Sequence, residues 1–236
     1  MTAGLGQAIR DEITGLILDR RLRPGDPLPT ESELVETLGV SRNSIREALK
    51  ALQALDIVEI RHGYGTYVGN LSLAPFADGL TFRALHDIGR DLRSMEEIVE
   101  VREALENALI RRVAATVPEI DLLALDEVTD RMNERAQSGL TFAEEDRQFH
   151  ELLYRSLSNS LVTQLLRAFW DVFHRVNHQL GVTDPDPVLT VERHRAIVSA
   201  VRDRDLARAE LAMTEHFRNL DFRVAQLRTG GADQPP

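Results

Sequence analysis

Hydrophobic residues recur at steps of three and four along most of the chain, which is the spacing of amphipathic helices. Between residues 58 and 68 the spacing changes to two short alternating runs, a pattern typical of strands. The predicted fold class is therefore mainly α, with one small β element in the first third of the chain. The predicted helices cover residues 5–20, 30–39, 41–54, 73–87, 95–115, 119–137, 142–157, 160–180, 187–201 and 204–227.

Capping signals support several of these boundaries. Thr30 and Glu33 have the spacing of a capping box, and Ser41 is a suitable N-cap for the next helix. Two further pairs have the same box spacing, namely Ser94 with Glu97 and Thr141 with Glu144. Glycines lie at predicted helix ends at positions 39, 139 and 181. The first part of the chain is thus predicted to contain one helix, then two helices joined by a tight turn.

The helix predicted at 41–54 has two different faces. Its apolar face carries Ile45, Ala48, Leu49 and Leu52. Its opposite face carries Arg42, Asn43, Arg46 and Lys50. Arginine on such a face can bond guanine or phosphate in the major groove of DNA, so the pattern is that of a recognition helix. A solvated basic surface is the simpler explanation of the same pattern when it stands alone.

Residues 58–61 and 66–68 predict two strands joined by a glycine turn, which is the arrangement of a DNA-binding wing. Gly63 can bring its backbone close to a phosphate, and Arg61 and His62 can reach the neighbouring minor groove. A plain hairpin that closes the core of the domain explains the strands, but not the basic tip.

Three segments in this order resemble the winged helix-turn-helix domain of the GntR family over residues 5–68. They are RPGDPLPTESEL, GVSRNSIREAL and RHGYGTYV. The resemblance implies that DNA is contacted by Ser41, Arg42, Asn43, Ser44 and Arg46, with His62 and Gly63 on the wing. Where many relatives have an arginine two residues before the leucine of the second helix, this chain has Ser32. The contact made by that arginine is therefore expected to be absent or replaced.

Composition narrows the possible classes of protein. At 236 residues the chain is long enough for two domains, and no apolar run approaches the length of a membrane span. The first residues lack the basic start and apolar stretch of a secretory signal, so the expected location is the cytoplasm. The absence of cysteine excludes disulfides, thiolate metal sites and a cysteine nucleophile. A metal ion would have to be bound by histidines and carboxylates.

The net charge of −10 is unevenly distributed. Residues 1–70 hold 8 basic and 10 acidic residues, whereas residues 71–236 hold 20 and 28. Because phosphate contacts need Arg or Lys, an acidic protein of this kind is expected to bind DNA through a small basic face.

From residue 70 onward the helical spacing continues almost to residue 228, which predicts an antiparallel all-α bundle. The predicted organisation is a DNA-binding domain at 1–69, a linker at 70–75, an effector-binding and dimerisation domain at 76–228, and a disordered tail at 229–236.

Histidines in the predicted bundle are candidates for a metal site. Asp146 and His150 are four residues apart on one helix face, and His194 and His216 lie on the last two helices. One carboxylate with three imidazoles suits a divalent ion such as Zn²⁺ or Ni²⁺. His174 and His178 are also four residues apart and could act as metal ligands in place of some of these residues. Hydrogen-bonded interior or surface histidines are the simpler explanation of each residue taken alone.

Residues 75–222 resemble the FCD domain, the ligand-sensing domain of the FadR subfamily. The matching segments are VEVREALE at 99–106, DRQFH at 146–150, ERHRAI at 192–197 and EHF at 215–217. The resemblance implies that a divalent metal is bound by Asp146, His150, His194 and His216, which leaves His174 and His178 on the surface or behind the ligands. It also implies that Arg102 binds the carboxylate of a small organic acid, such as a hydroxy acid, a dicarboxylate or a sugar acid. The alternative for Arg102 is an ion pair with Glu106 on a wet face. An acyl-CoA effector is not expected, because the family's acyl-CoA regulator lacks this metal set.

The predicted protein is a DNA-binding transcription regulator, most simply a repressor, that binds operator DNA as a homodimer and responds to a small carboxylate. A regulator with the metal ion itself as signal is one alternative. A metal-dependent hydrolase is another, but the chain has no phosphate-binding loop, no G-x-S-x-G motif and no obvious general base. The prediction is therefore that the protein is not an enzyme.

Overall fold

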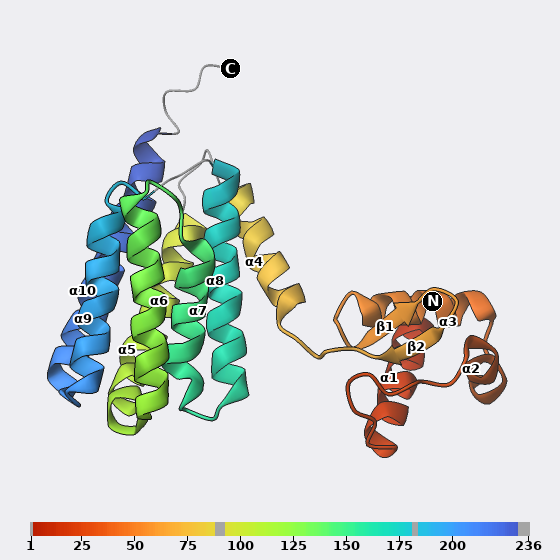
Figure 1. Cartoon of the computed structure of the whole chain (residues 1–236). Coiled ribbons are helices and arrows are strands. Elements are labelled where there is room, and N and C mark those ends of the chain that lie inside the picture. Colours follow the sequence, from red (N-terminus) through yellow and green to blue (C-terminus); the bar gives the residue numbers. More distant parts are fainter. Residues whose placement is uncertain (1, 88–92, 181–183, 231–236) are drawn as a thin grey trace. The chain divides into compact units, whose positions relative to one another are not determined.

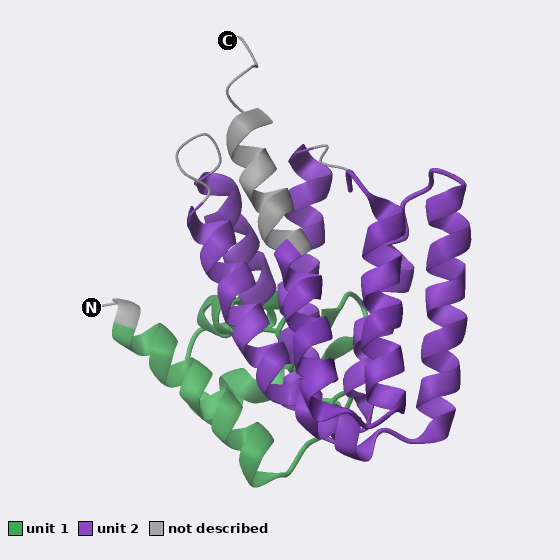
Figure 2. Cartoon of the chain, turned by 90° about the vertical axis from the view of Figure 1, so that its left-hand side faces the viewer, with its two compact units in different colours: residues 1–75 green, residues 76–236 purple. Residues whose placement is uncertain are grey.

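The computed structural model describes residues 2–87, 93–180 and 184–230, with side chains described for residues 4–87, 93–180 and 184–218. The chain forms two compact units, residues 1–75 and residues 76–236 (Figure 2). The mainly helical prediction is confirmed, since the described residues form ten helices and one two-stranded sheet (Figure 1).

The first unit packs three helices against a small hairpin. The helices are α1 (Thr2–Asp19), α2 (Glu31–Leu38) and α3 (Arg42–Gln53), and the strands are β1 (Val58–Arg61) and β2 (Gly65–Val68). The strands are antiparallel, with Val58 opposite Val68 and Arg61 opposite Gly65. Aliphatic side chains from every element form one buried core, which includes Ile9, Ile13, Leu34, Ile45, Leu49, Leu52, Val58 and Val68.

Local hydrogen bonds explain where α2 and α3 begin and end. The predicted capping box is confirmed, because Thr30 Oγ1 accepts from the Glu33 backbone and the Glu33 carboxylate accepts from the Thr30 backbone. Gly39 ends α2 with a φ of 65°, a left-handed conformation that favours glycine. Ser41 then caps α3 by accepting a hydrogen bond from the Ser44 backbone. These caps place the start of α3 directly after a tight turn.

The second unit is an antiparallel bundle. Its helices are α4 (Ala74–His86), α5 (Arg93–Thr116), α6 (Glu119–Gln137), α7 (Ala143–Arg155), α8 (Ser160–Leu180), α9 (Pro187–Arg202) and α10 (Leu206–Gly230). From α5 to α10 successive helices run in opposite directions (Figure 1). Helix α5 packs against α10, and α6 packs against α7 and α9. Five of these helices direct polar side chains into the middle of the bundle.

Two predicted capping boxes are wrong. Helix α5 begins at Arg93, so Ser94 lies inside it, where its hydroxyl donates to Asp87 and accepts from Arg83. Helix α7 begins after Phe142, whose ring is buried, and it has no side-chain cap.

Two predicted features fall partly or wholly outside the described residues. Position 181, where a glycine was expected to end a helix, lies outside them. Of the predicted tail, residues 231–236 also lie outside, while α10 is described to Gly230.

Gly69 makes a close backbone contact directly after β2. Its N–H donates to the Ile57 carbonyl at 2.9 Å, and a methyl group added at Gly69 would lie 2.4 Å from the Asp56 carbonyl oxygen. Gly69→Ala is therefore expected to lower the free energy of unfolding of this unit by about 1–3 kcal/mol, as overpacking does elsewhere. Amide hydrogen exchange of α1–α3 in the full chain measures the effect.

Gly15→Ala is the matched control, because Gly15 lies in α1 and a methyl group there meets nothing within 4 Å. Alanine is expected to stabilise this helix position by about 0.5–1 kcal/mol. Equal protection of α1–α3 in Gly69→Ala and the wild type would contradict the predicted clash.

Candidate functional site

Helix α3 exposes the basic face that the sequence predicted. Arg42, Asn43 and Arg46 are exposed, whereas Ile45 and Leu49 are completely buried against the core of the first unit. The polar face is therefore accessible to a partner while the apolar face positions the helix. Ser41 and Ser44 lie at the helix start, where their hydroxyl oxygens are 2.8 Å apart.

The start of α2 holds both arginines. Arg42 Nη2 donates to Ser32 Oγ at 3.0 Å, and Arg46 Nε donates to both carboxylate oxygens of Glu31, at 2.8 and 3.1 Å. Ser32 is thus a partner of a predicted DNA-contacting arginine. Because these side chains are exposed, the two pairs are weak and phosphate or base contacts can replace them.

The hairpin carries His62 and Gly63 at its exposed tip, where Gly63 has a φ of 80°. The predicted basic tip is only partly free, because Arg61 pairs with Glu59 and lies 4.2 Å from the ring centroid of Tyr67. Residues 25–28 run beside β2 and anchor the hairpin through backbone hydrogen bonds, including one from the Leu28 backbone N–H to the Thr66 carbonyl. Next to the glycine, Tyr64 is 81% exposed, a side chain that the sequence analysis did not single out.

All four predicted metal ligands come together inside the bundle. His150 of α7, His194 of α9 and His216 of α10 are buried, and each offers a ring nitrogen within 4.8 Å of the others. Asp146, one turn before His150, places Oδ1 2.9 Å from His194 Nε2 and 3.8 Å from His150 Nε2. The carboxylate and three imidazoles therefore face one small volume.

Hydrogen bonding shows that this volume suits a cation. His194 Nδ1 lies 2.7 Å from the Thr190 carbonyl, which can only accept, so Nδ1 carries a proton. His194 Nε2 faces Asp146 Oδ1 at 2.9 Å, and this close approach requires a positive charge between the two atoms, either a proton or a metal ion. Nε2 of His216 is buried and has no hydrogen-bond partner. The donor set of three imidazoles and one carboxylate therefore fits a divalent metal.

Electrostatics favours the protonation states that metal binding requires. Burial lowers the pKa of His216 well below its ordinary value, and the neighbouring His194 and His150 add to the effect. Burial works against ionisation of Asp146, but His174 and His194 outweigh it and hold the pKa of this carboxyl well below its usual range. The site thus presents a neutral imidazole and a carboxylate.

Helix α8 holds the second oxygen of Asp146. Trp170 Nε1 donates to Asp146 Oδ2 at 2.9 Å, and His174 Nε2 lies 3.1 Å from the same atom. His174 is therefore a carboxylate partner behind the candidate ligands, whereas His178 is exposed and away from them. Trp170 was missed by the sequence analysis, because an indole on an amphipathic helix is ordinarily a core residue.

Arg102 of α5 lies beside the same cluster. Its Nε donates to Glu106 Oε1 at 2.6 Å, and its Nη2 is 3.2 Å from His150 Nε2. The ion pair with Glu106 was predicted as the alternative, but the predicted wet face is wrong, because the two side chains are only 4% and 1% exposed. Burial favours neutral Glu106, yet Arg102 and His150 outweigh it and hold the pKa of this carboxyl far below its usual range. A guanidinium is thus buried next to the candidate metal ligands.

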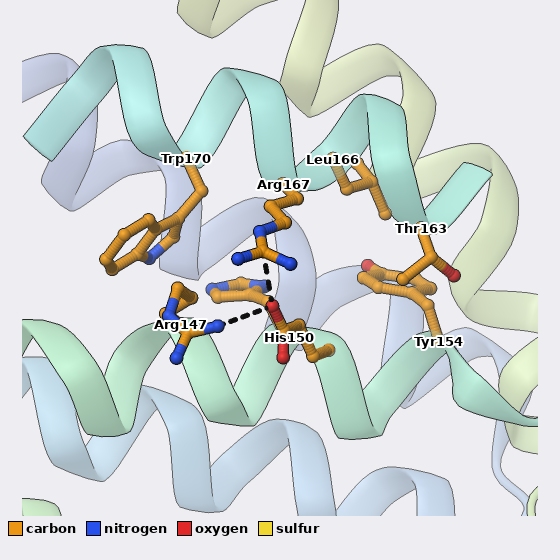
Figure 3. Close-up of a pocket in the computed structure, with 8 residues that line it drawn as sticks. Arg147, His150, Tyr154, Thr163, Leu166, Arg167 and Trp170 are labelled. Carbon is orange, nitrogen blue, oxygen red and sulfur yellow. Dashed lines mark hydrogen bonds and ion pairs between the residues drawn. The ribbon is translucent and has the colours of Figure 1, made fainter. Parts of the chain in front are cut away.

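A pocket between α7 and α8 leads toward this cluster (Figure 3). The space in it that a water-sized sphere can occupy is only about 10 Å³, and His150 and Tyr154 are among the residues that line it. Arg147 and Arg167 both approach Glu151, at 2.7 and 3.8 Å. The pocket therefore has basic groups at its lining and a candidate metal ligand behind them.

Comparison with known protein families assigns both units. Residues 97–219 match the FCD domain, and residues 5–68 match the family described as bacterial regulatory proteins, gntR family. The chain belongs to the GntR family. It is a DNA-binding transcription regulator with a C-terminal ligand-binding FCD domain, and the family is one of regulators rather than enzymes.

Individual relatives agree with this assignment over almost the full chain. An uncharacterized HTH-type transcriptional regulator of Mycobacterium tuberculosis is 32% identical, over 93% of this chain and 89% of the relative. The galactonate operon transcriptional repressor of Escherichia coli K12 is 29% identical, over 86% of this chain and 90% of the relative. The solved structure of a Streptococcus agalactiae GntR protein is similar at a TM-score of 0.65 and 26% identity, covering 91% of this chain and 98% of that chain. None of the described helices of the present protein is long and apolar enough to cross a membrane.

Proposed function

We propose that this GntR-family regulator is a repressor that leaves operator DNA when a small organic acid binds in its FCD domain. The observation that carries this proposal is the buried meeting point of Asp146, three histidines and Arg102. Two neighbouring cationic groups, a metal ion and a guanidinium, are what a carboxylate ligand needs in a buried site.

The ligands for the ion are Asp146, His150, His194 and His216, and Zn²⁺ or Ni²⁺ suits them best. The metal supplies positive charge to the oxygens of the acid, and Arg102 supplies a planar pair of donors. The effector is expected to be a hydroxy acid, a dicarboxylate or a sugar acid. The named function of the Escherichia coli relative, repression of a galactonate operon, supports a sugar acid and a repressing role.

The DNA side of the proposal places α3 in the major groove. The contacting residues are Ser41, Arg42, Asn43, Ser44 and Arg46, with His62 and Gly63 of the wing at the flanking backbone or minor groove. Operators with two half-sites are read by two-fold dimers, so the regulator is expected to act as a homodimer in the cytoplasm, where operator DNA lies. Acid binding favours a conformation in which the two DNA-binding domains of the dimer no longer fit both half-sites of the operator.

The test combines metal analysis with a thermal-shift screen of small carboxylates. The wild type is expected to carry about one divalent ion per chain and to be stabilised by an acid at 100 times its Kd by about 2.7 kcal/mol. His194→Ala is expected to lose both the ion and the stabilisation. His178→Ala, which removes an exposed histidine of the same bundle, is the control and is expected to keep both.

Each contrary outcome has a distinct meaning. A wild type without metal that no carboxylate stabilises would refute the proposed sensing site and leave the family assignment intact. Loss of DNA control on chelation alone, with no effect of any acid, would make the ion itself the signal. Equal metal content in His194→Ala and the wild type would refute the ligand set.

A further inference from the structure

Glu106 of α5 is a completely buried carboxylate shared by three partners. It accepts from Arg102 Nε at 2.6 Å through Oε1, and from Tyr154 Oη at 2.8 Å through Oε2. The same Oε2 lies 3.1 Å from His150 Nδ1. Its side chain is 1% exposed, so water does not compete for these bonds. One carboxylate thus joins a candidate metal ligand, the candidate effector residue and a tyrosine.

The contact with Glu106 decides how His150 can use its other nitrogen. A carboxylate oxygen that already accepts from Tyr154 can only accept again, so His150 Nδ1 must carry its proton. Nε2 then carries the lone pair, which faces Asp146 and accepts from Arg102 Nη2 at 3.2 Å. A histidine that donates one N–H to a carboxylate while the other nitrogen faces a metal is fixed in both tautomer and orientation.

We propose that Glu106 is a positioning residue, which fixes His150 for metal binding and holds Arg102 beside the metal. The inference rests on the proposed function, because it needs the metal site. This role goes beyond that of an ordinary buried ion pair. Any nearby carboxylate could neutralise Arg102, but Glu106 also contacts the metal-ligand candidate His150. Glu106 therefore contacts both a proposed metal ligand, His150, and the proposed effector-binding guanidinium of Arg102.

The experiment compares Glu106→Gln with Tyr154→Phe, which removes another bond to the same carboxylate without touching His150. Glutamine has nearly the same shape, but its amide can donate or accept, so residue 106 no longer imposes the tautomer of His150, and only the Arg102 N–H toward Nε2 still favours it. Zn²⁺ affinity, measured by competition with a chromophoric chelator, is expected to fall about 10–100-fold in Glu106→Gln. In Tyr154→Phe it is expected to change by at most about fivefold, as for one ordinary hydrogen bond. The visible spectrum of the Co²⁺-loaded protein is expected to change in Glu106→Gln alone.

A second pair of variants covers the possibility that Glu106→Gln does not fold. Removing either Glu106 or Arg102 alone leaves the charge of the other residue buried without its partner, which is strongly destabilising. Arg102→Met/Glu106→Gln removes both charges, and it is compared with Arg102→Met. The double variant is still expected to bind Zn²⁺ about 10–100-fold more weakly than Arg102→Met, because the role of Glu106 toward His150 does not depend on Arg102.

A readout without metal separates this inference from the proposed function. Long-range ¹H–¹⁵N correlation of the His150 ring in the metal-free wild type is expected to show a protonated Nδ1, and a mixture of tautomers is expected in Arg102→Met/Glu106→Gln, which lacks both groups that impose this tautomer. Wild-type affinity and an unchanged Co²⁺ spectrum in Glu106→Gln would overturn the inference while the metal site stands. A wild type that binds no metal would refute the proposed function, and an unprotonated Nδ1 would then overturn the Glu106 contact as well.

Discussion

Replacing Arg42 and Arg46 together by alanine is expected to abolish specific operator binding. Both side chains lie on the exposed face of α3, and both are held there by weak contacts with α2 that DNA can replace. A bidentate arginine contact with a base contributes about 1–3 kcal/mol. Because the proposed homodimer would present each arginine twice, the combined loss is expected to exceed about 100-fold in affinity.

The measurement is fluorescence anisotropy with an operator obtained by binding-site selection, at several salt concentrations. An arginine that contacts phosphate lowers the salt dependence when it is removed, whereas one that contacts a base changes sequence preference. Arg111→Ala/Arg112→Ala removes the same charge from exposed positions of α5 and is the matched control. Wild-type affinity in Arg42→Ala/Arg46→Ala would contradict the assignment of α3 as the recognition helix.

Periodicity was sufficient to predict the helices and the two faces of α3. The apolar stripe of α3 is the buried one, because helical spacing alone determines which residues share a side. Periodicity could not show that Asp146 and His194, 48 positions apart, approach to 2.9 Å. That expectation came from the resemblance to the FCD domain, and the packing of α7, α9 and α10 now gives its geometry.

The surroundings of Arg102 could not be predicted from spacing. An Arg–Glu ion pair with a spacing of four residues on a helix is ordinarily exposed to solvent. The local sequence does not distinguish an exposed pair from a buried one. Its burial depends on α7 and α10, which supply His150 and the Phe217 ring, whose centroid lies 5.4 Å from the guanidinium carbon. Glu106 was missed as a functional candidate for the same reason. The segment VEVREALE includes Glu106, but only the packing of the helices shows which groups its carboxylate contacts.

Arg102→Met is expected to produce a regulator that binds metal and operator but responds to acid only at a much higher concentration. Methionine fills a similar volume without charge. Because it leaves the buried Glu106 carboxylate without its guanidinium partner, the variant is also expected to be less stable. The loss of the paired Arg102 donors to a buried carboxylate ligand costs about 2–5 kcal/mol, or at least about 30-fold in acid affinity. Calorimetry on the metal-loaded protein, with the acid found in the thermal-shift screen, measures this loss. Operator release by the same acid is expected to require a correspondingly higher concentration.

Arg195→Met is the control for the loss of a guanidinium from this bundle, because Arg195 of α9 is exposed and pairs with Asp130 at the surface. It is expected to keep wild-type acid affinity. Arg102→Lys adds a sharper comparison, since lysine restores the charge but not the planar pair of donors, so partial recovery would separate charge from geometry. Wild-type operator release in Arg102→Met would mean that the metal alone binds the acid. Arg102 would then serve only as the buried partner of Glu106.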